Sequence, residues 1–147
     1  MKPDALQRGL VGEIIHRFER KGLKIIGMKM MQLEDALLDT HYAHHKDKPF
    51  FGDIKKFMKS APVIAIALSG INGVSAVRTI VGPIKGYEAP PGTIRGDFSL
   101  SIQANVVHAS DSPENGAEEV ARFFSDDEIF FYRKIDFGYI YSDEASE

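Results

Sequence analysis

Apolar residues recur along the chain with two different spacings, which together predict helices and strands. Leu10, Ile14 and Phe18 follow one another at intervals of four, the spacing of one helix face. Residues 63–68 form an unbroken apolar run, which is typical of a strand buried on both faces. The predicted elements in chain order are helix 10–18, strand 23–31, helices 33–45 and 50–58, strand 63–68, helix 72–81, a strand ending at His108, a helix from 112 and a short helix at 125–128.

This order predicts an α+β fold. With one more strand in front, it is the ferredoxin-like βαββαβ arrangement, an antiparallel sheet with helices on one face. We expect residues 1–147 to form a single domain. Residues 82–104 carry four glycines and three prolines with little periodicity, which predicts a long functional loop without regular structure. The acidic tail at 142–147 is expected to be disordered.

The stretch leading into the helix at 112 carries the clearest candidate chemistry. Ser112 is a good helix N-cap, Pro113 suits the first helical position, and Glu114 complements the positive end of the helix dipole. His108 is therefore expected at the tip of a strand, close to backbone N–H groups that bind anions. It is either a nucleophile or a partly buried histidine with a satisfied hydrogen bond.

Composition excludes several functional classes. The 147 residues carry a formal charge of −3, which argues against a broad nucleic-acid surface. The absence of cysteine excludes disulfides and thiol catalysis and fits a reducing compartment. No apolar run approaches the roughly 20 residues of a membrane helix, and the first ten residues do not resemble a signal peptide. We therefore expect a cytoplasmic protein with no membrane partner.

Two further groups of residues each have two interpretations. His41, His44 and His45 share one face of a predicted helix. They form either a zinc or copper site or, since no further ligand is placed to complete such a site, a solvated basic face. Arg95 lies between glycine and proline breakers, as either a guanidinium held toward an anion or a surface arginine paired with Asp97.

Five blocks of the sequence resemble the nucleoside diphosphate kinase family in order and spacing, and they span nearly the entire chain. The blocks are Lys2-Pro3-Asp4-Ala5 with Gln7-Arg8-Gly9-Leu10, His41-Tyr42, Pro49-Phe50-Phe51, Pro90-Pro91-Gly92-Thr93-Ile94-Arg95-Gly96-Asp97-Phe98, and Asn105-Val106-Val107-His108-Ala109-Ser110-Asp111-Ser112.

The resemblance implies ping-pong transfer of the γ-phosphate from a nucleoside triphosphate such as ATP to a nucleoside diphosphate. His108 would be the nucleophile that carries the phosphate between the two half-reactions. Glu119 would accept a hydrogen bond from the other ring nitrogen and fix the tautomer, and Ser110 would support that pair.

The resemblance also assigns the phosphate contacts. Lys2 and Tyr42 would hold the transferring phosphate, and Arg78 and Arg95 would neutralise the rest of the polyphosphate. Ile84 stands where the family commonly has a threonine donor, so one phosphate contact is expected to be lost or supplied by the neighbouring lysine.

The base and sugar contacts follow in the same way. Phe50 would stack on the base, and Ile54 and Ile102 would line the slot. Lys2 and Asn105 would reach the sugar hydroxyls. Stacking on an aromatic ring does not depend on which base is present, so we expect all common bases to be accepted.

The resemblance further implies Mg²⁺ bound mainly through the nucleotide phosphates, with Asp111 near it through water and no protein-only metal site. It also implies a homo-oligomer, with a hexamer expected. The departure is at the N-terminus, where family members have an apolar strand before the lysine and this sequence has only Met1.

Two other functions remain open at this stage. The first is a non-catalytic nucleotide-binding or scaffolding subunit that the missing strand has disabled. The second is single-stranded nucleic-acid binding, which rests only on aromatic and basic residues near a cleft.

Overall fold

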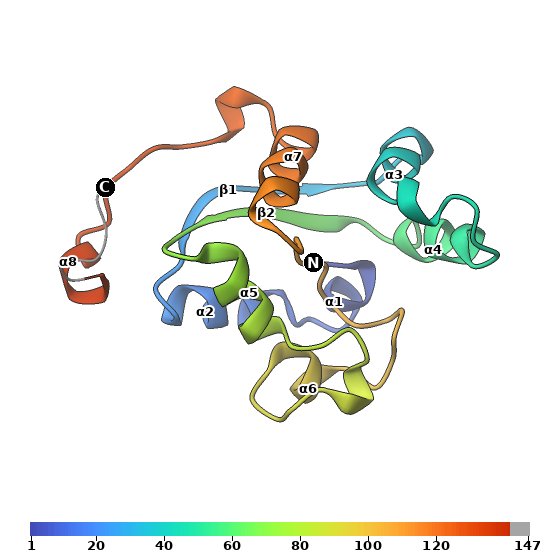
Figure 1. Ribbon diagram of the computed structural model, residues 1–147, viewed down its shortest axis with the longest axis horizontal. Coiled ribbons are helices and arrows are strands. Elements are labelled where there is room, and N and C mark those ends of the chain that lie inside the picture. The colour runs from blue at the N-terminus through green and yellow to red at the C-terminus, as the bar shows by residue number, and fades with distance from the viewer. Residues whose placement is uncertain (142–147) are drawn as a thin grey trace.

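The computed structural model describes residues 1–141, and the predicted disordered tail at 142–147 lies outside the described residues. Figure 1 shows helices arranged around a two-stranded ribbon. The strands are β1 (Lys24–Met31) and β2 (Val63–Ser69). The helices are α1 (Pro3–Gln7), α2 (Val11–Arg20), α3 (Asp35–His41), α4 (Phe51–Met58), α5 (Gly73–Val81), α6 (Ile94–Phe98), α7 (Pro113–Phe123) and α8 (Phe137–Ile140), with 3-10 turns η1 (Ala43–His45), η2 (Gly86–Glu88) and η3 (Asp126–Glu128). None of the helices in residues 1–141 has the length and apolar character needed to cross a membrane.

The two strands pair antiparallel, as predicted. Their register runs from Lys24 opposite Ser69 to Met31 opposite Val63, with an irregularity between Ile25 and Gly27. A Cβ at Gly27 would lie 2.9 Å from Cδ1 of Ile129 and 3.0 Å from the carbonyl oxygen of Glu128, so glycine at this position lets the segment after α7 pass close over β1.

The predicted third strand, ending at His108, is not a strand in the structure. The only backbone contact that ties it to a neighbouring segment within residues 1–141 is a hydrogen bond of 2.9 Å from the N–H of Lys2 to the carbonyl of Val106. A strand needs a partner along its whole length, and residues 1–141 place no strand beside this segment. Val106 is buried and has a φ of 61°, an unusual conformation for a β-branched residue. Its N–H donates to Oδ2 of Asp4 at 3.0 Å.

Two apolar clusters support the fold and meet at the candidate site. The first joins α2 and α5 with the segment before His108, including Ile14, Val81 and Val107. The second lies under α3 and α4 and includes Leu38 and Tyr42. His108 directly follows the first cluster and Tyr42 belongs to the second, so the candidate site is assembled from both.

Residues 82–104 are more ordered than the sequence predicts, because they contain η2 and α6. Thr93 caps α6 by accepting a hydrogen bond of 3.0 Å from the N–H of Gly96. Asp97 forms an ion pair of 2.7 Å with Arg17 of α2. Such contacts come from distant parts of the chain, which is why local periodicity did not reveal these helices.

Replacing Gly96 by alanine is expected to lower the free energy of unfolding by about 2 kcal/mol, a typical cost of overpacking. The added Cβ would lie 1.9 Å from the backbone oxygen of Pro90, so the loop must shift. Gly12→Ala in α2 is the control, because its Cβ would meet nothing within 4 Å and alanine favours a helix by up to about 1 kcal/mol. Urea denaturation followed by circular dichroism measures both. A Gly96→Ala protein as stable as the wild type would contradict the packing described here.

Candidate active site

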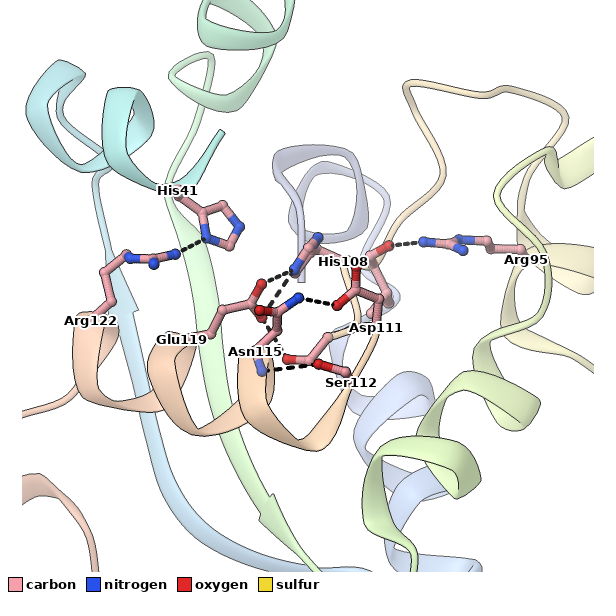
Figure 2. A network of polar contacts seen from close by, with 10 residues as sticks. His41, Arg95, His108, Asp111, Ser112, Asn115, Glu119 and Arg122 are labelled. Atoms are coloured by element: carbon pink, nitrogen blue, oxygen red, sulfur yellow. Dashed lines mark hydrogen bonds and ion pairs between the residues drawn. The ribbon is translucent and has the colours of Figure 1, made fainter. Parts of the chain in front are cut away.

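His108 lies at the start of α7, as the sequence predicts. Ser112 caps the helix, since its Oγ accepts a hydrogen bond of 3.1 Å from the N–H of Asn115. Asp111 accepts a hydrogen bond of 2.5 Å from the side chain of Asn115. The segment carrying His108 is thus fixed to the first turn of α7, and Figure 2 shows the ring of His108 beside that turn.

Glu119 holds one ring nitrogen of His108. Nε2 of His108 lies 3.0 Å and 3.2 Å from the two carboxylate oxygens of Glu119, and the hydroxyl of Ser110 donates to the same carboxylate at 2.5 Å. A carboxylate bound to Nε2 favours the tautomer with its proton there. The lone pair is then on Nδ1, which carries no hydrogen bond to any of residues 1–141 in the structure.

Glu119 is suited to remain ionised in this position. Partial burial favours its neutral form, but the hydrogen bonds from His108 and Ser110 outweigh burial and hold the pKa of the Glu119 carboxyl well below its usual value. The acceptor beside His108 is therefore a carboxylate at neutral pH.

His41 lies against His108, a contact that the sequence pattern does not predict. The rings are 4.7 Å apart between centroids, edge to face, and Arg122 of α7 lies 3.2 Å from Nδ1 of His41. Burial and the neighbouring His108 lower the pKa of His41 to about 4, so its ring is neutral at pH 7. The predicted basic face of three histidines is wrong for His41, because His41 is buried at the end of α3, while His44 and His45 lie in the following turn, η1. The burial of His41 could have been predicted from its spacing, because His41 lies three residues after Leu38, which is also buried.

Lys2 and Asn105 meet on the segment before His108. Nζ of Lys2 donates to Oδ1 of Asn105 at 2.6 Å and to the carbonyl of Gln103 at 3.1 Å. Asn105 is 1% exposed, and its amide donates to the carbonyl of Ile84 at 2.8 Å. Burial, and then the charge of Arg95, lowers the pKa of Lys2 to about 8.

Arg95 is held in place by backbone carbonyls and is not the surface arginine paired with Asp97 that was one of its two interpretations. Its buried guanidinium donates to the carbonyls of Gly82 at 3.0 Å, Asn105 at 3.3 Å and Val107 at 2.6 Å. Asp97 is not its partner. Burial, and then Arg78, lowers the pKa of Arg95 to about 10. Arg95 therefore holds the backbone on both sides of Val106 in place.

A cavity of about 1550 Å³ opens in front of His108. The predicted site residues that line it are Lys2, Tyr42, Arg78, His108, Ser110 and Glu119. Tyr42 is buried there, with its ring centroid 6.4 Å from that of His108. The structure thus brings the predicted phosphate-handling residues together, apart from Arg95 and Ile84.

The residues predicted to hold the base lie outside this cavity. Phe50 and Ile102 are exposed, and Ile54 packs against the second apolar cluster. The side chain of Gln103 donates to the carbonyl of Asp53 at 3.1 Å, which links the loop carrying Ile102 to the helix carrying Ile54. Ile84 is also exposed.

Comparison with known proteins agrees with this geometry. The family described as "Nucleoside diphosphate kinase" matches residues 1–129. The chain belongs to this family.

Individual relatives are similar over most of their length. The nucleoside diphosphate kinase of Archaeoglobus fulgidus is 51% identical over 143 residues, 97% of this chain and 95% of the relative. That of Parabacteroides distasonis is 55% identical over 132 residues, 90% of this chain and 86% of the relative. A solved structure of the Halobacterium salinarum kinase in complex with CDP has a TM-score of 0.93 at 40% identity and covers 95% of this chain and 93% of that one. These likenesses confirm the predicted family and its α+β fold.

In the described part of this nucleoside diphosphate kinase family member, the histidine and carboxylate side chains do not form an oxygen-rich metal cage. Within residues 1–141, the one group of three or more histidine and carboxylate side chains that could meet at one ion is His41, His108 and Glu119. Two of its three ligands are nitrogens, whereas Mg²⁺ prefers oxygen. Asp111, three residues after His108, is an exposed carboxylate on the cavity wall, which fits an ion held mainly by phosphates.

The ammonium of Lys2 is expected to titrate near pH 8, well below the 10.5 of an ordinary lysine. Replacing Asn105 by aspartate should raise the pKa of Lys2, since a carboxylate would stand where the amide oxygen now lies 2.6 Å from Nζ. NMR titration of the Lys2 side chain in both proteins measures this shift. A wild-type Lys2 that titrates at the ordinary lysine value of 10.5 would contradict its burial.

Proposed function

We propose that this protein transfers the γ-phosphate of a nucleoside triphosphate to a nucleoside diphosphate through a phosphohistidine at His108. The observation that carries the proposal is the double contact of Glu119 with Nε2 of His108. It leaves Nδ1 as the ring nitrogen with an available lone pair, beside a cavity large enough for a polyphosphate.

In the first half-reaction, the lone pair of Nδ1 attacks the γ-phosphorus. The bond between that phosphorus and the bridging oxygen breaks, and the nucleoside diphosphate leaves with the bond's electrons. The ring now carries positive charge, which the carboxylate of Glu119 stabilises through Nε2–H. In the second half-reaction, a terminal oxygen of another nucleoside diphosphate attacks the phosphohistidine and restores the neutral ring.

Lys2, Tyr42 and Arg78 supply the groups that face the phosphates. Burial, and then the charge of Glu119, raises the pKa of Tyr42 to about 12, so its hydroxyl remains a hydrogen-bond donor. Lys2 and Arg78 supply positive charge where the transition state spreads negative charge over oxygen. We assign Arg95 mainly to holding the backbone before His108, and only its remaining N–H groups to the polyphosphate.

We assign the nucleoside to the start of α4, outside the cavity that holds the phosphates. Phe50 is exposed there and can stack on any base, while Ile54 and Ile102 bound the same side. Lys2 and Asn105 are the candidates for the sugar hydroxyls. Binding of CDP by the Halobacterium relative supports this assignment of nucleotides as substrates.

We also propose that Mg²⁺ accompanies the nucleotide, held by its phosphates with Asp111 as the carboxylate available through water. Bound there, it would neutralise charge on the phosphate oxygens.

Exposed apolar side chains in the segment after η3, such as Phe130, Phe131 and Tyr139, support assembly into a homo-oligomer. A hexamer in the cytoplasm is the form we expect.

Incubation with γ-labelled ATP and Mg²⁺ should transfer label to the protein as an acid-labile phosphohistidine. His108→Ala should abolish it, because within residues 1–141 His108 alone combines a carboxylate on one ring nitrogen with a second nitrogen available at the cavity. His44→Ala, at an exposed position, should label like the wild type. A folded wild-type protein that stays unlabelled would favour the non-catalytic nucleotide-binding subunit instead.

Glu119→Gln should slow phosphorylation of His108 by roughly 10²-fold, the usual size of such an effect. The amide keeps the shape of the carboxylate but not its charge, so the developing positive ring is less stabilised. Glu118→Gln, which changes the exposed neighbouring carboxylate on α7, should leave the rate unchanged. Quenched-flow measurement of single-turnover labelling tests both variants. Equal rates for the two would remove Glu119 from the proposed mechanism.

A further inference from the structure

The imidazole of His41 has no role in the phosphotransfer described above, although it is buried against the histidine that reacts. Its ring meets that of His108 edge to face, with the centroids 4.7 Å apart. One ring nitrogen of His41, one of His108 and a carboxylate oxygen of Glu119 all lie within 4.8 Å of one another. Figure 2 shows the three side chains close together, at the end of α3, before α7 and on α7.

Two imidazoles and one carboxylate form a donor set that suits Zn²⁺. Catalytic zinc sites commonly have three protein ligands of these kinds, with water in the fourth position. The lowered pKa values of His41 and Glu119 keep the imidazole neutral and the carboxyl ionised at pH 7, and these are the forms that bind a metal. Mg²⁺ prefers six oxygen ligands, so this group discriminates against it.

The donor atoms need only a small movement to fit a tetrahedral ion. Ligand atoms about 2.1 Å from such an ion lie about 3.4 Å from one another. Nε2 of His108 is already 3.0 Å and 3.2 Å from the two oxygens of Glu119. Because all three donor atoms lie within 4.8 Å, His41 reaches the same spacing with a shift of about 1.4 Å at most.

The group is open to solvent on one side and closed on the other. All three side chains line the cavity. The side chain of His108 is 39% exposed and that of Glu119 is 20% exposed, so an ion can reach them from the cavity. His41 is buried and closes the far side. The fourth ligand position is therefore left to water or to a ligand in the cavity.

Arg122 is the group that opposes a cation at this position. It lies 3.2 Å from Nδ1 of His41, and a guanidinium can only donate hydrogen bonds. Its positive charge therefore acts against a metal ion on the same ring. Ser110 is compatible with the ion, since its hydroxyl donates to Glu119 at 2.5 Å and a carboxylate has further lone pairs for a metal.

An ion on Nε2 of His108 changes which ring nitrogen carries the proton. Without the ion, the carboxylate of Glu119 favours the proton on Nε2 and leaves the lone pair on Nδ1. A metal needs the lone pair of Nε2, so the one proton of the neutral ring moves through solvent to Nδ1. Nδ1 then has no lone pair with which to attack phosphorus.

We propose that His41, His108 and Glu119 bind one Zn²⁺ ion, and that the bound ion blocks phosphorylation of His108 by moving the ring proton to Nδ1. The zinc site is independent of phosphotransfer, whereas the inhibition rests on the proposed function. Zinc binding thus makes the same imidazole either a nucleophile or a metal ligand.

Titration calorimetry with ZnCl₂ and no nucleotide tests the site. The wild-type protein should bind one Zn²⁺ per chain, and MgCl₂ should not bind there. His41→Phe keeps a ring but has no lone pair, and Glu119→Gln has no charge, so each should bind zinc at least tenfold more weakly. Arg122→Gln should bind at least threefold more tightly, because the opposing charge is gone. Circular dichroism checks that each variant is folded.

The matched control removes the neighbouring pair of histidines. His44 and His45 have ring centroids 4.0 Å apart and are the alternative place for a zinc ion. A protein with His44→Ala and His45→Ala together should bind Zn²⁺ as the wild type does. Loss of binding in this control, with His41→Phe unaffected, would place the ion in η1 and overturn the site. Absence of one-to-one binding by the folded wild-type protein would also overturn it.

Two measurements test the inhibition. NMR correlation of the ring nitrogens with the ring hydrogens should show the proton of His108 on Nε2 without zinc and on Nδ1 with zinc. Zinc at saturation should slow labelling of His108 by γ-labelled ATP at least tenfold in the wild-type protein and less than twofold in His41→Phe, each compared with the same protein without zinc. ATP binds part of the zinc equally in both mixtures.

The two parts of the proposal fail in different ways. A proton that stays on Nε2 with zinc bound, or equal inhibition of His41→Phe, overturns the inhibition. A wild-type protein that binds zinc but is never labelled, with or without it, contradicts the proposed function and the inhibition, while the zinc site stands.

Discussion

The short backbone link at Met1 and Lys2 is the contact on which the arrangement of the site depends. It hydrogen-bonds to Ile64 on one side and to Val106 on the other, and so joins β2 to the segment that carries His108. Asp4 strengthens the same junction by accepting the N–H of Val106. Because these bonds involve residues 1–4, the position of His108 relative to the sheet is set by a segment far from it in the sequence.

The two apolar clusters then decide which groups meet. One cluster supports the segment before His108 and the other supports Tyr42, while α7 contributes Glu119. Three separate parts of the chain therefore converge on one imidazole. The result is a ring with one nitrogen bound by a carboxylate and one nitrogen available, beside basic side chains and an open cavity.

Most helices and both observed strands could be predicted from the sequence, because their apolar residues repeat within a short stretch. The start of α7 was clear from Ser112 and Pro113, whose preferences are local. The segment before His108 was wrongly predicted to be a strand, since pairing depends on a distant neighbour. The helix α6 was missed for a similar reason, as its ion pair with Arg17 is long-range. Among the site residues, Glu119 was assigned through the family resemblance and not through its local pattern. The contact of His41 with His108 was not foreseen, because it depends on how α3 packs.

The three carbonyl contacts of Arg95 have a consequence for the thermodynamics of anion binding. A free arginine side chain gives up about 2 kcal/mol of conformational entropy when it is fixed. In this protein that ordering takes place during folding, when the guanidinium binds the carbonyls of Gly82, Asn105 and Val107. Three of its five N–H groups are used in this way, and two are left for a ligand. An anion that reaches Arg95 thus meets a rigid, preorganised donor, and its binding free energy is not reduced by the ordering of that side chain.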